Sequence, residues 1–247
     1  MNIQSIKKFV PILVVIFLFG CSGTTESIEL RLNYPKGFQQ TLVTKTTSNG
    51  KSMKMNNTII IQMKLDSVDN IGSYVFESNV LKIQFESEMY GEVEKYDSDK
   101  EESEMSASES SFHDEFKQLL DSSLSISINK KGKVVKPFQF SNGKLSDAVD
   151  MSNIQIVFPE KAVKVGEKWT SEKSNAFAET KATYSISEIT RDKIIIEMNS
   201  IIKGTLLGNS KAKGEYVLDK LTMRVMKVKI EFDTNIAGRT IFEAYEK

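Results

Sequence analysis

The sequence contains very little of the chemistry from which most active sites are built. Its 247 residues include one cysteine, one histidine and one tryptophan. A single cysteine has no partner for a disulfide within the chain. A zinc site draws on several histidine or cysteine ligands, which this chain does not supply. These absences argue against both a disulfide framework and a zinc site.

The sequence also offers few of the residues and motifs that nucleophilic catalysis requires. Any histidine-dependent mechanism must use His113, which lies beside Asp114 and Glu115, whereas a catalytic triad converges from separated elements. No Gly-x-Ser-x-Gly segment occurs, and residues 204–208 indicate a turn between strands rather than a phosphate-binding loop. Carboxylate pairs of the glycosidase type stay open, because the chain has 33 acidic residues. We expect a protein that is not an enzyme and uses no catalytic residue or cofactor.

Acidic residues are concentrated in one segment. Twelve acidic and two basic residues lie between positions 86 and 115. From Asp97 the carboxylates alternate as in a calcium loop, but an EF-hand needs Gly at its sixth position and Glu at its twelfth. Those positions hold Glu102 and Ser108. We therefore expect a solvated run of charge with no metal site, and we expect its second half to be a mobile loop. A weak cation site in this segment is the alternative.

The N-terminus has the layout of an export signal. Lys7 and Lys8 precede an uncharged apolar run over residues 9–19, which Gly20 and Cys21 follow. This order is typical of a secretory signal peptide, and the run is shorter than the roughly 18 apolar residues of a membrane-spanning helix. The alternative, a short buried helix of a cytosolic domain, is disfavoured because the run has no polar face. We predict a lipoprotein signal peptide over residues 1–20.

The segment Leu18-Phe19-Gly20-Cys21 resembles the lipobox of bacterial lipoproteins. The resemblance implies cleavage between Gly20 and Cys21 and attachment of lipid to Cys21, although Phe19 is bulkier than is usual. Ser22 follows without an acidic run, which by the same resemblance favours the periplasmic face of the outer membrane. Residues 21–27 then form a lipidated N-terminus and short tether, and six extended residues reach about 20 Å.

The remaining chain has no charge excess that would attract nucleic acid. Without Lys7 and Lys8 it has 31 basic and 33 acidic residues, a net charge of −2. We therefore expect no nucleic-acid partner. The expected contact with a membrane is made through the N-terminal lipid.

Alternation of apolar and polar residues dominates from Ser27 onward and predicts half-buried strands. It is clearest in four runs: 59–66, 81–86 (with Leu81, Ile83 and Phe85 on one face), 124–128 and 226–233. Short turns separate the strands, at 69–72, 129–132, 191–192 and 237–238, and the glycine at 132 should supply a positive φ. Short connections imply antiparallel neighbours, and we count about ten strands.

Helix signals are few. Phe112 and Phe116 begin one apolar face, with Ser111 and Asp114 as the expected capping box, and a weaker candidate covers residues 144–151. Two short helices cannot cover a ten-stranded sheet, so we predict a mainly β fold, with a strongly curved antiparallel sheet or half-barrel and the helices inside it or across its mouth. A β-sandwich is the alternative.

Residues 28–247 are expected to form one β-rich domain. Faint similarity suggests two halves, at about 28–110 and 160–247, joined by a segment with short helices. Chance likeness between antiparallel strands is the alternative explanation.

The stretch from Phe158 to Trp169 is the most distinctive in the domain. Pro159 ends the preceding segment, Gly166 permits a tight bend and Trp169 begins a strand. We expect these three residues to be structural anchors, with a ligand platform at Trp169 as the alternative. With Lys36-Gly37 and residues 214–219, this stretch resembles an uncharacterised, Bacteroidetes-type family of bacterial envelope lipoproteins with a domain of unknown function. The resemblance implies a β-rich exported domain without known catalytic residues.

Together these features favour a membrane-anchored, non-catalytic envelope lipoprotein. A large one-sided apolar sheet with few helices tends to leave a groove, which suits a hydrophobic or lipid-like ligand or a protein partner. The alternatives are a structural or assembly scaffold and, third, an enzyme of unidentified class.

Overall fold

The computed structural model describes residues 27–140, 155–174, 178–204, 208–234 and 237–247. These residues form one large antiparallel sheet, one α-helix and one short 3-10 helix. In these ranges no helix is both long enough and apolar enough to cross a membrane.

The elements follow one another through short connections. In chain order they are β1 (Gln39–Asn49), β2 (Met53–Val68), β3 (Tyr74–Met89), β4 (Glu92–Asp97), η1 (Glu102–Glu104), α1 (Ala107–Asp121), β5 (Ser123–Ile128), β6 (Val134–Phe140), β7 (Lys168–Ser174), β8 (Ala178–Ile189), β9 (Lys193–Gly204), β10 (Gly208–Asp219), β11 (Val225–Thr234) and β12 (Gly238–Glu246).

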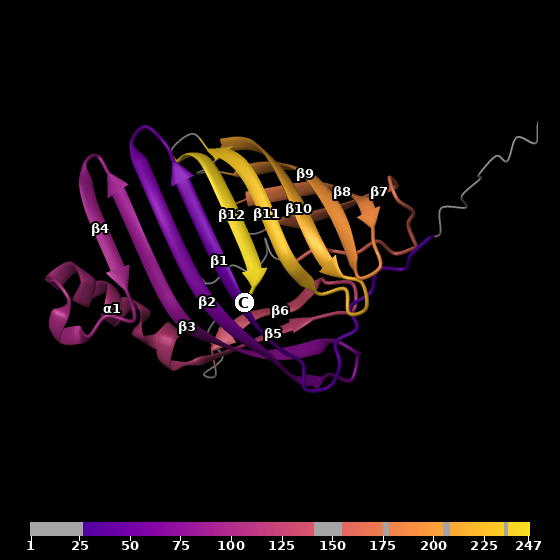
Figure 1. Cartoon of the computed structure of the whole chain (residues 1–247), viewed down its shortest axis with the longest axis horizontal. Coiled ribbons are helices and arrows are strands. Elements are labelled where there is room, and N and C mark those ends of the chain that lie inside the picture. The colour runs from indigo at the N-terminus through magenta and orange to yellow at the C-terminus, as the bar shows by residue number, and fades with distance from the viewer. Residues whose placement is uncertain (1–26, 141–154, 175–177, 205–207, 235–236) are drawn as a thin grey trace, which may run out of the picture.

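The sheet is continuous, and β6 and β7 form its two ends. Its order is β6-β5-β3-β2-β1-β12-β11-β10-β9-β8-β7, with β4 added beside β3. Figure 1 shows it curling, so that β5 and β6 pass behind the strands nearest the viewer. The single curved sheet confirms the predicted fold class, with twelve strands rather than about ten, and the β-sandwich alternative is wrong.

The predicted alternation places one face of the strands in a common core. In β5 the side chains of Leu124, Ile126 and Ile128 are at most 2% exposed, and β9 buries Ile194 and Ile196 in the same way. The buried side chains of both halves of the sheet belong to one contiguous cluster. Burial of this apolar area is the main driving force for folding.

A β-bulge changes the alternation in β3. The pairing of β2 with β3 skips Leu81, which is 49% exposed, whereas Val80 and Ile83 are buried. The prediction that Leu81 shares a face with Ile83 and Phe85 is therefore wrong at Leu81. The extra residue is turned outward, so that the apolar residues on both sides of it keep facing the core.

The helix α1 confirms the predicted helix around Phe112 but begins earlier in the chain. The Ser106 hydroxyl accepts a hydrogen bond from the Glu109 amide at 3.3 Å, and the Glu109 carboxylate accepts one from the Ser106 amide at 2.8 Å. The predicted cap at Ser111 and Asp114 is wrong, because Ser106 and Glu109 already form a complete capping box.

The second half of the acidic segment 86–115 is helical, which corrects the prediction of a mobile loop. Its order comes from aromatic packing on the inner face of the sheet. The ring of Phe112 meets that of Phe85 edge-on at 4.8 Å, and Phe116 lies 5.6 Å from Tyr96. Such contacts offset the ordering entropy that a run of charges alone would not. The helix predicted at 144–151 lies outside the described residues.

The proposed division into similar halves remains a prediction. Residues 28–110 contain β1 to β4, and residues 160–247 contain β7 to β12. The two sets lie side by side in one sheet through the pairing of β1 with β12.

Gly132 offers a direct test of the β5–β6 turn. Its φ is +77°, as predicted, and an added Cβ would lie 2.1 Å from the carbonyl oxygen of Ile156. Gly132→Ala should lower the free energy of unfolding by about 2–4 kcal/mol, because strain and a backbone clash act together. Urea denaturation measures this change.

Gly72→Ala is the matched control. Gly72 has a φ of +80°, but an added Cβ would meet nothing within 4 Å. This variant should lose only about 1 kcal/mol, the cost of the left-handed backbone. Equal losses in the two variants would contradict the close approach of residue 156 to the turn.

Candidate functional site

The inner face of the sheet is the largest candidate surface, and its composition changes along the strands. At the end where β10 turns into β11 it carries large apolar side chains. Tyr216, Ile196 and Ile186 lie next to one another on β10, β9 and β8, and none is more than 1% exposed. Burial raises the pKa of the Tyr216 hydroxyl and that of the nearby Tyr184 hydroxyl. Both phenols therefore stay neutral, as an apolar surface requires.

Small side chains replace these large ones toward the other end of the strands. The strand registers place one row across β1, β12, β11, β10, β9, β8 and β7: Ser48, Thr240, Phe232, Ala212, Ser200, Ala182 and Ser171. All but Phe232 are small, and we call this set the small-residue row. Ala212 and Ala182 are at most 3% exposed and Ser200 is 6% exposed. The hydroxyls of Ser48 and Thr240 are hydrogen-bonded at 2.9 Å. Most of the row is nevertheless buried, and Ala212 and Ala182 belong to the same core cluster as the large side chains.

Two extended segments link the open ends of the sheet, and we call residues 28–33 and 155–166 together the clasp. On the β6 side, the amide of Phe158 donates to the Lys131 carbonyl at 2.8 Å. On the opposite side, the amide of Gly166 donates to the Ile186 carbonyl of β8 at 2.8 Å. The two segments of the clasp pair with each other through Ile28 and Val163. An open sheet is thereby held in its curved form.

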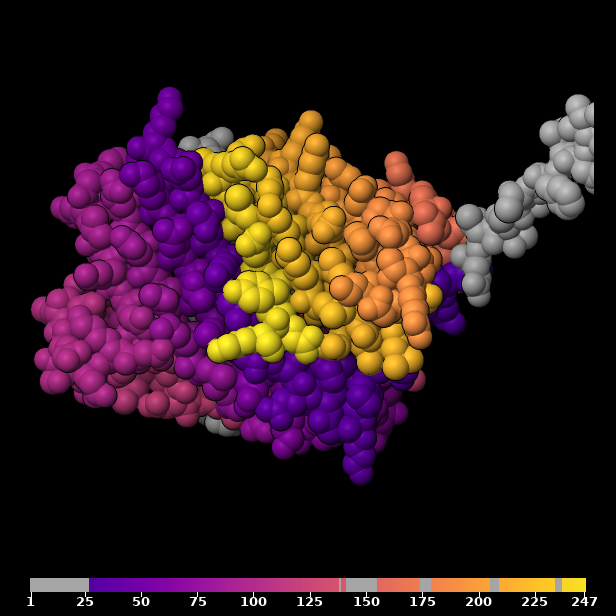
Figure 2. All heavy atoms as spheres, in the orientation of Figure 1, coloured from indigo at the N-terminus to yellow at the C-terminus, as the bar shows by residue number. Residues whose placement is uncertain are grey.

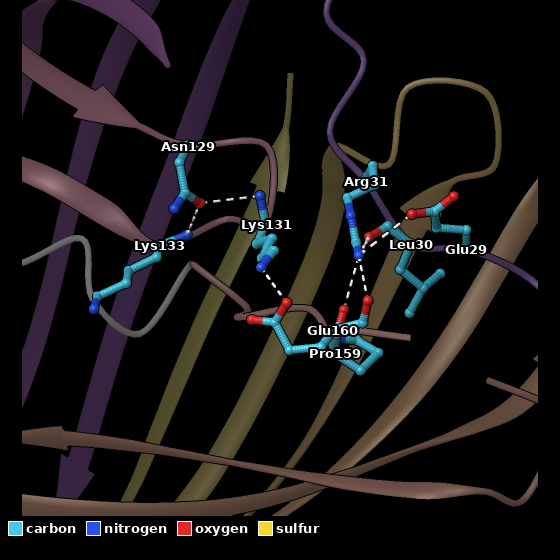
Figure 3. A network of polar contacts seen from close by, with 8 residues as sticks. All are labelled: Glu29, Leu30, Arg31, Asn129, Lys131, Lys133, Pro159 and Glu160. Carbon is cyan, nitrogen blue, oxygen red and sulfur yellow. Dashed lines mark hydrogen bonds and ion pairs between the residues drawn. The ribbon is translucent and has the colours of Figure 1, made fainter. Parts of the chain in front are cut away.

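Arg31 is the central side chain of the clasp (Figure 3). Its guanidinium donates to the carbonyls of Leu30 at 2.6 Å and of Pro159 and Glu160 at 2.7 Å. The neighbouring Lys131 forms an ion pair with Glu160. A planar guanidinium suits such convergent acceptors, because several of its N–H groups lie in one plane.

The residues predicted as structural anchors all belong to the clasp or adjoin it. The indole of Trp169 is 8% exposed, donates to the Val157 carbonyl at 2.9 Å and stacks on Tyr184 at 5.5 Å. Gly166 has a φ of +81°, and Pro159 supplies a carbonyl to Arg31. Trp169 thus ties the edge strand β7 to the clasp.

The predicted lipid-attachment residue Cys21 and its neighbour Gly20 lie outside the described residues. The first described contact of the N-terminal segment is made by Ile28, whose amide donates to the Val163 carbonyl at 2.8 Å. The described chain therefore begins at the clasp.

The sole histidine, His113, lies on α1 at the other side of the molecule and faces Tyr96 of β4. Its Nδ1 lies 3.2 Å from the Tyr96 hydroxyl, and its Nε2 lies 3.2 Å from a Glu102 carboxylate oxygen. Nearby, Lys100 donates to Glu109 at 2.8 Å. This hydrogen bond, followed by that from the Ser106 amide, lowers the pKa of Glu109 to about 2. These contacts secure the start of α1.

Two hollows on the outer face are lined mainly by polar residues. One, of about 460 Å³, crosses β9, β10 and β11 and is lined mainly by alternating Lys and Glu side chains such as Lys213, Glu215 and Lys229. Another, of about 490 Å³, adjoins β4 and includes Glu86, Lys95 and other polar groups. Figure 2 views the outer face of the central strands, where the hollows in the surface are shallow. In the ranges that the structure covers, no group of three or more His, Cys, Asp or Glu side chains could hold a metal ion.

Sequence reasoning did not find Arg31 or the small-residue row. Arg31 is one of 33 basic residues, and its three acceptors are backbone carbonyls that leave no mark in the sequence. The row joins single residues from seven strands, so it exists only once the registers are known. A capping-box search would have found Ser106 and Glu109.

Comparison with known proteins gives a family match over part of the chain. A family of unknown function (DUF6263) matches residues 138–240, which run from β6 into β12. No curated protein matches the chain. The chain therefore contains a β-rich domain of unknown function.

A solved structure titled "Lipid-protein interactions in lipovitellin" has a similar fold, with a TM-score of 0.55 and 8% sequence identity. The match covers 87% of this chain and 25% of that one, so this chain spans about a quarter of that protein. At this identity the likeness shows the fold alone.

Arg31→Lys tests the clasp while keeping the charge. Lysine cannot reproduce the planar set of donors, so the free energy of unfolding should fall by about 1–2 kcal/mol. Arg239→Lys is the control, because Arg239 is 63% exposed and pairs only with a carboxylate across a strand turn, Glu231; it should change stability by less than about 0.5 kcal/mol. Urea denaturation measures both, and equal effects would contradict the role of Arg31.

Glu109 makes stability depend on pH. Its pKa falls from 4.5 to about 2 on folding, so its contribution is complete above about pH 4.5 and is lost as the pH falls toward 2. The melting temperature of wild type should exceed that of Glu109→Gln most above pH 4.5, and the gap should narrow on acidification. The exposed Glu104→Gln serves as control. A gap for Glu109→Gln that is constant with pH would show that the carboxylate does not act in this way.

Proposed function

We propose that the protein is a non-catalytic lipoprotein of the bacterial cell envelope, anchored through Cys21, that binds a hydrophobic, lipid-like ligand on the inner face of its sheet. The observation that carries the proposal is the curved sheet with one apolar face and little helical cover. In the described ranges the only α-helix, α1, packs against β3 and β4 at one side, leaving β7 to β12 without a helix on their inner face.

We place the proposed ligand at the small-residue row. Ala212, Ser200 and Ala182 place small side chains next to one another on three adjacent strands. Next to them, Phe232 and Ile202 are partly buried and pack against the core. Ligand pockets of this kind are mostly apolar with a few hydroxyl groups, and Ser48, Thr240 and Ser200 supply such groups. Acyl chains fit this chemistry better than sugars or nucleotides.

The fold gives further support. The similar solved structure concerns lipid–protein interactions in lipovitellin. This likeness in fold supports a lipid-like ligand for the curved sheet of the present protein. A structural or assembly scaffold, the second candidate, would use the outer face, where Lys and Glu side chains alternate on β9, β10 and β11.

Lipid content is the first test. A Cys21→Ala protein purified without detergent should carry extractable lipid and gain thermal stability from added fatty acids or phospholipids. Ala212→Phe and Ser200→Phe should reduce lipid occupancy by roughly tenfold, equivalent to ~1.4 kcal/mol of binding free energy, because the added rings fill the row.

Matched controls lie on the same strands with side chains on the outer face. Lys213→Phe and Asn199→Phe should keep the lipid occupancy of the parent protein, and circular dichroism should confirm that all four variants fold. Absence of lipid together with no thermal shift would overturn the proposal. A stoichiometric protein partner in its place would favour the scaffold.

A further inference from the structure

Several turns meet at the end of the molecule where the clasp lies. The amide of Leu32 donates to the Lys130 carbonyl at 2.8 Å, and that of Asn33 donates to the Thr222 carbonyl at 2.9 Å. The amide of Lys220 in turn donates to the carbonyl of Asp192 at 2.9 Å. These hydrogen bonds join the N-terminal segment to the β5–β6, β8–β9 and β10–β11 turns. We call residues 28–37, 129–133, 158–168, 190–193 and 219–224 the basic end.

The basic end has a large excess of positive charge. It contains twelve basic and five acidic residues. The basic ones are Arg31, Lys36, Lys130, Lys131, Lys133, Lys161, Lys164, Lys168, Arg191, Lys193, Lys220 and Arg224. Lys36, Lys161 and Lys164 are exposed. The adjacent β2–β3 turn adds Asp69, whose carboxylate accepts from the amides of its own turn.

Apolar side chains project from the same end. Leu221, at the tip of the β10–β11 turn, is 79% exposed, and Ile71, at the tip of the β2–β3 turn, is 79% exposed. Val165 in the clasp is 43% exposed. Basic residues with interspersed exposed apolar tips are the composition of surfaces that lie on anionic membranes.

The opposite side of the molecule is acidic. The segment 86–115, with twelve acidic and two basic residues, forms β4, η1 and the start of α1. In Figure 1 these elements lie at the left, whereas the described chain begins, in indigo, at the right. The molecule is therefore electrically polarised, with its positive end next to the tether.

The length of the tether brings the basic end to the membrane. Only residues 22–27 separate Cys21 from Ile28, and six extended residues reach about 20 Å. Ile28 is fixed by its hydrogen bond to Val163. This step rests on the proposed lipid anchor at Cys21.

We propose that the basic end is a docking surface for anionic lipid headgroups, with Leu221 at the depth of the headgroups, and that it fixes the orientation of the anchored protein with α1 pointing away from the bilayer. Lys and Arg near a negative membrane surface are attracted within a Debye length. The acidic segment is repelled by the same surface, so both ends favour one orientation.

Amide hydrogen exchange on vesicles tests this orientation. The full-length protein, as processed by the expressing cell, is purified in detergent and reconstituted into phosphatidylcholine vesicles with or without phosphatidylglycerol. Residues 219–224 and 33–37 should exchange several-fold more slowly when phosphatidylglycerol is present, and high salt should remove the difference. Residues 50–52 and 90–91, in turns at the far ends of their strands, should not respond.

Lysine variants provide the matched comparison. Replacing Lys36, Lys161 and Lys164 by Gln should reduce the phosphatidylglycerol-dependent slowing by roughly tenfold, because each lysine adds to the attraction. Replacing the exposed Lys51, Lys211 and Lys213 by Gln removes the same charge elsewhere and should leave the slowing unchanged. Slowing that is equal in both vesicle types, or equal effects of the two triple variants, would overturn the proposal.

The same preparation separates this proposal from the ligand proposal. Its intact mass shows whether Cys21 carries lipid, and an unmodified Cys21 would remove the anchor and the docking orientation together. Lipid occupancy of the Ala212→Phe and Ser200→Phe variants decides the ligand site independently of either result.

Discussion

The structure depends on the way its open sheet is held in a curve. Twelve antiparallel strands present one apolar face, and the edges at β6 and β7 are not paired with each other. The clasp connects these edges through hydrogen bonds. The Phe158 amide donates to the Lys131 carbonyl in the β5–β6 turn, and the Trp169 indole of β7 donates to the Val157 carbonyl. Arg31 holds the two clasp segments together through backbone carbonyls. Burial of the apolar face drives the sheet to enclose it, and the clasp hydrogen bonds fix the curved arrangement.

The two ends of the curved sheet differ in composition and in proposed function. Large side chains such as Tyr216 and Ile196 fill the interior next to the clasp, so that end is a packed core. Toward the other end lies the small-residue row, where a lipid-like ligand is proposed to bind. The clasp end holds the tether and the positive charge. Anchoring and ligand binding would thus occupy opposite ends of the same strands.

Much of the fold could be predicted from local pattern, because a half-buried strand must alternate. Leu124, Ile126 and Ile128 are buried as their spacing predicts. Leu81 could not be placed, since its bulge depends on pairing with β2. The candidate site was still less accessible to sequence reasoning. Its row joins residues as distant as Ser48 and Thr240, which only the strand register brings together.

The most direct test of the central claim is to map where a lipid touches the protein. A fatty acid with a photoreactive group in its chain, bound to the purified protein and cross-linked by light, marks the peptides that it contacts. The account predicts cross-links within residues 198–202 and 210–214, at the inner-face positions Ser200 and Ala212 and their immediate neighbours. Cross-links confined to outer-face residues such as Lys227 and Lys229, or none above the level of unfolded protein, would contradict it.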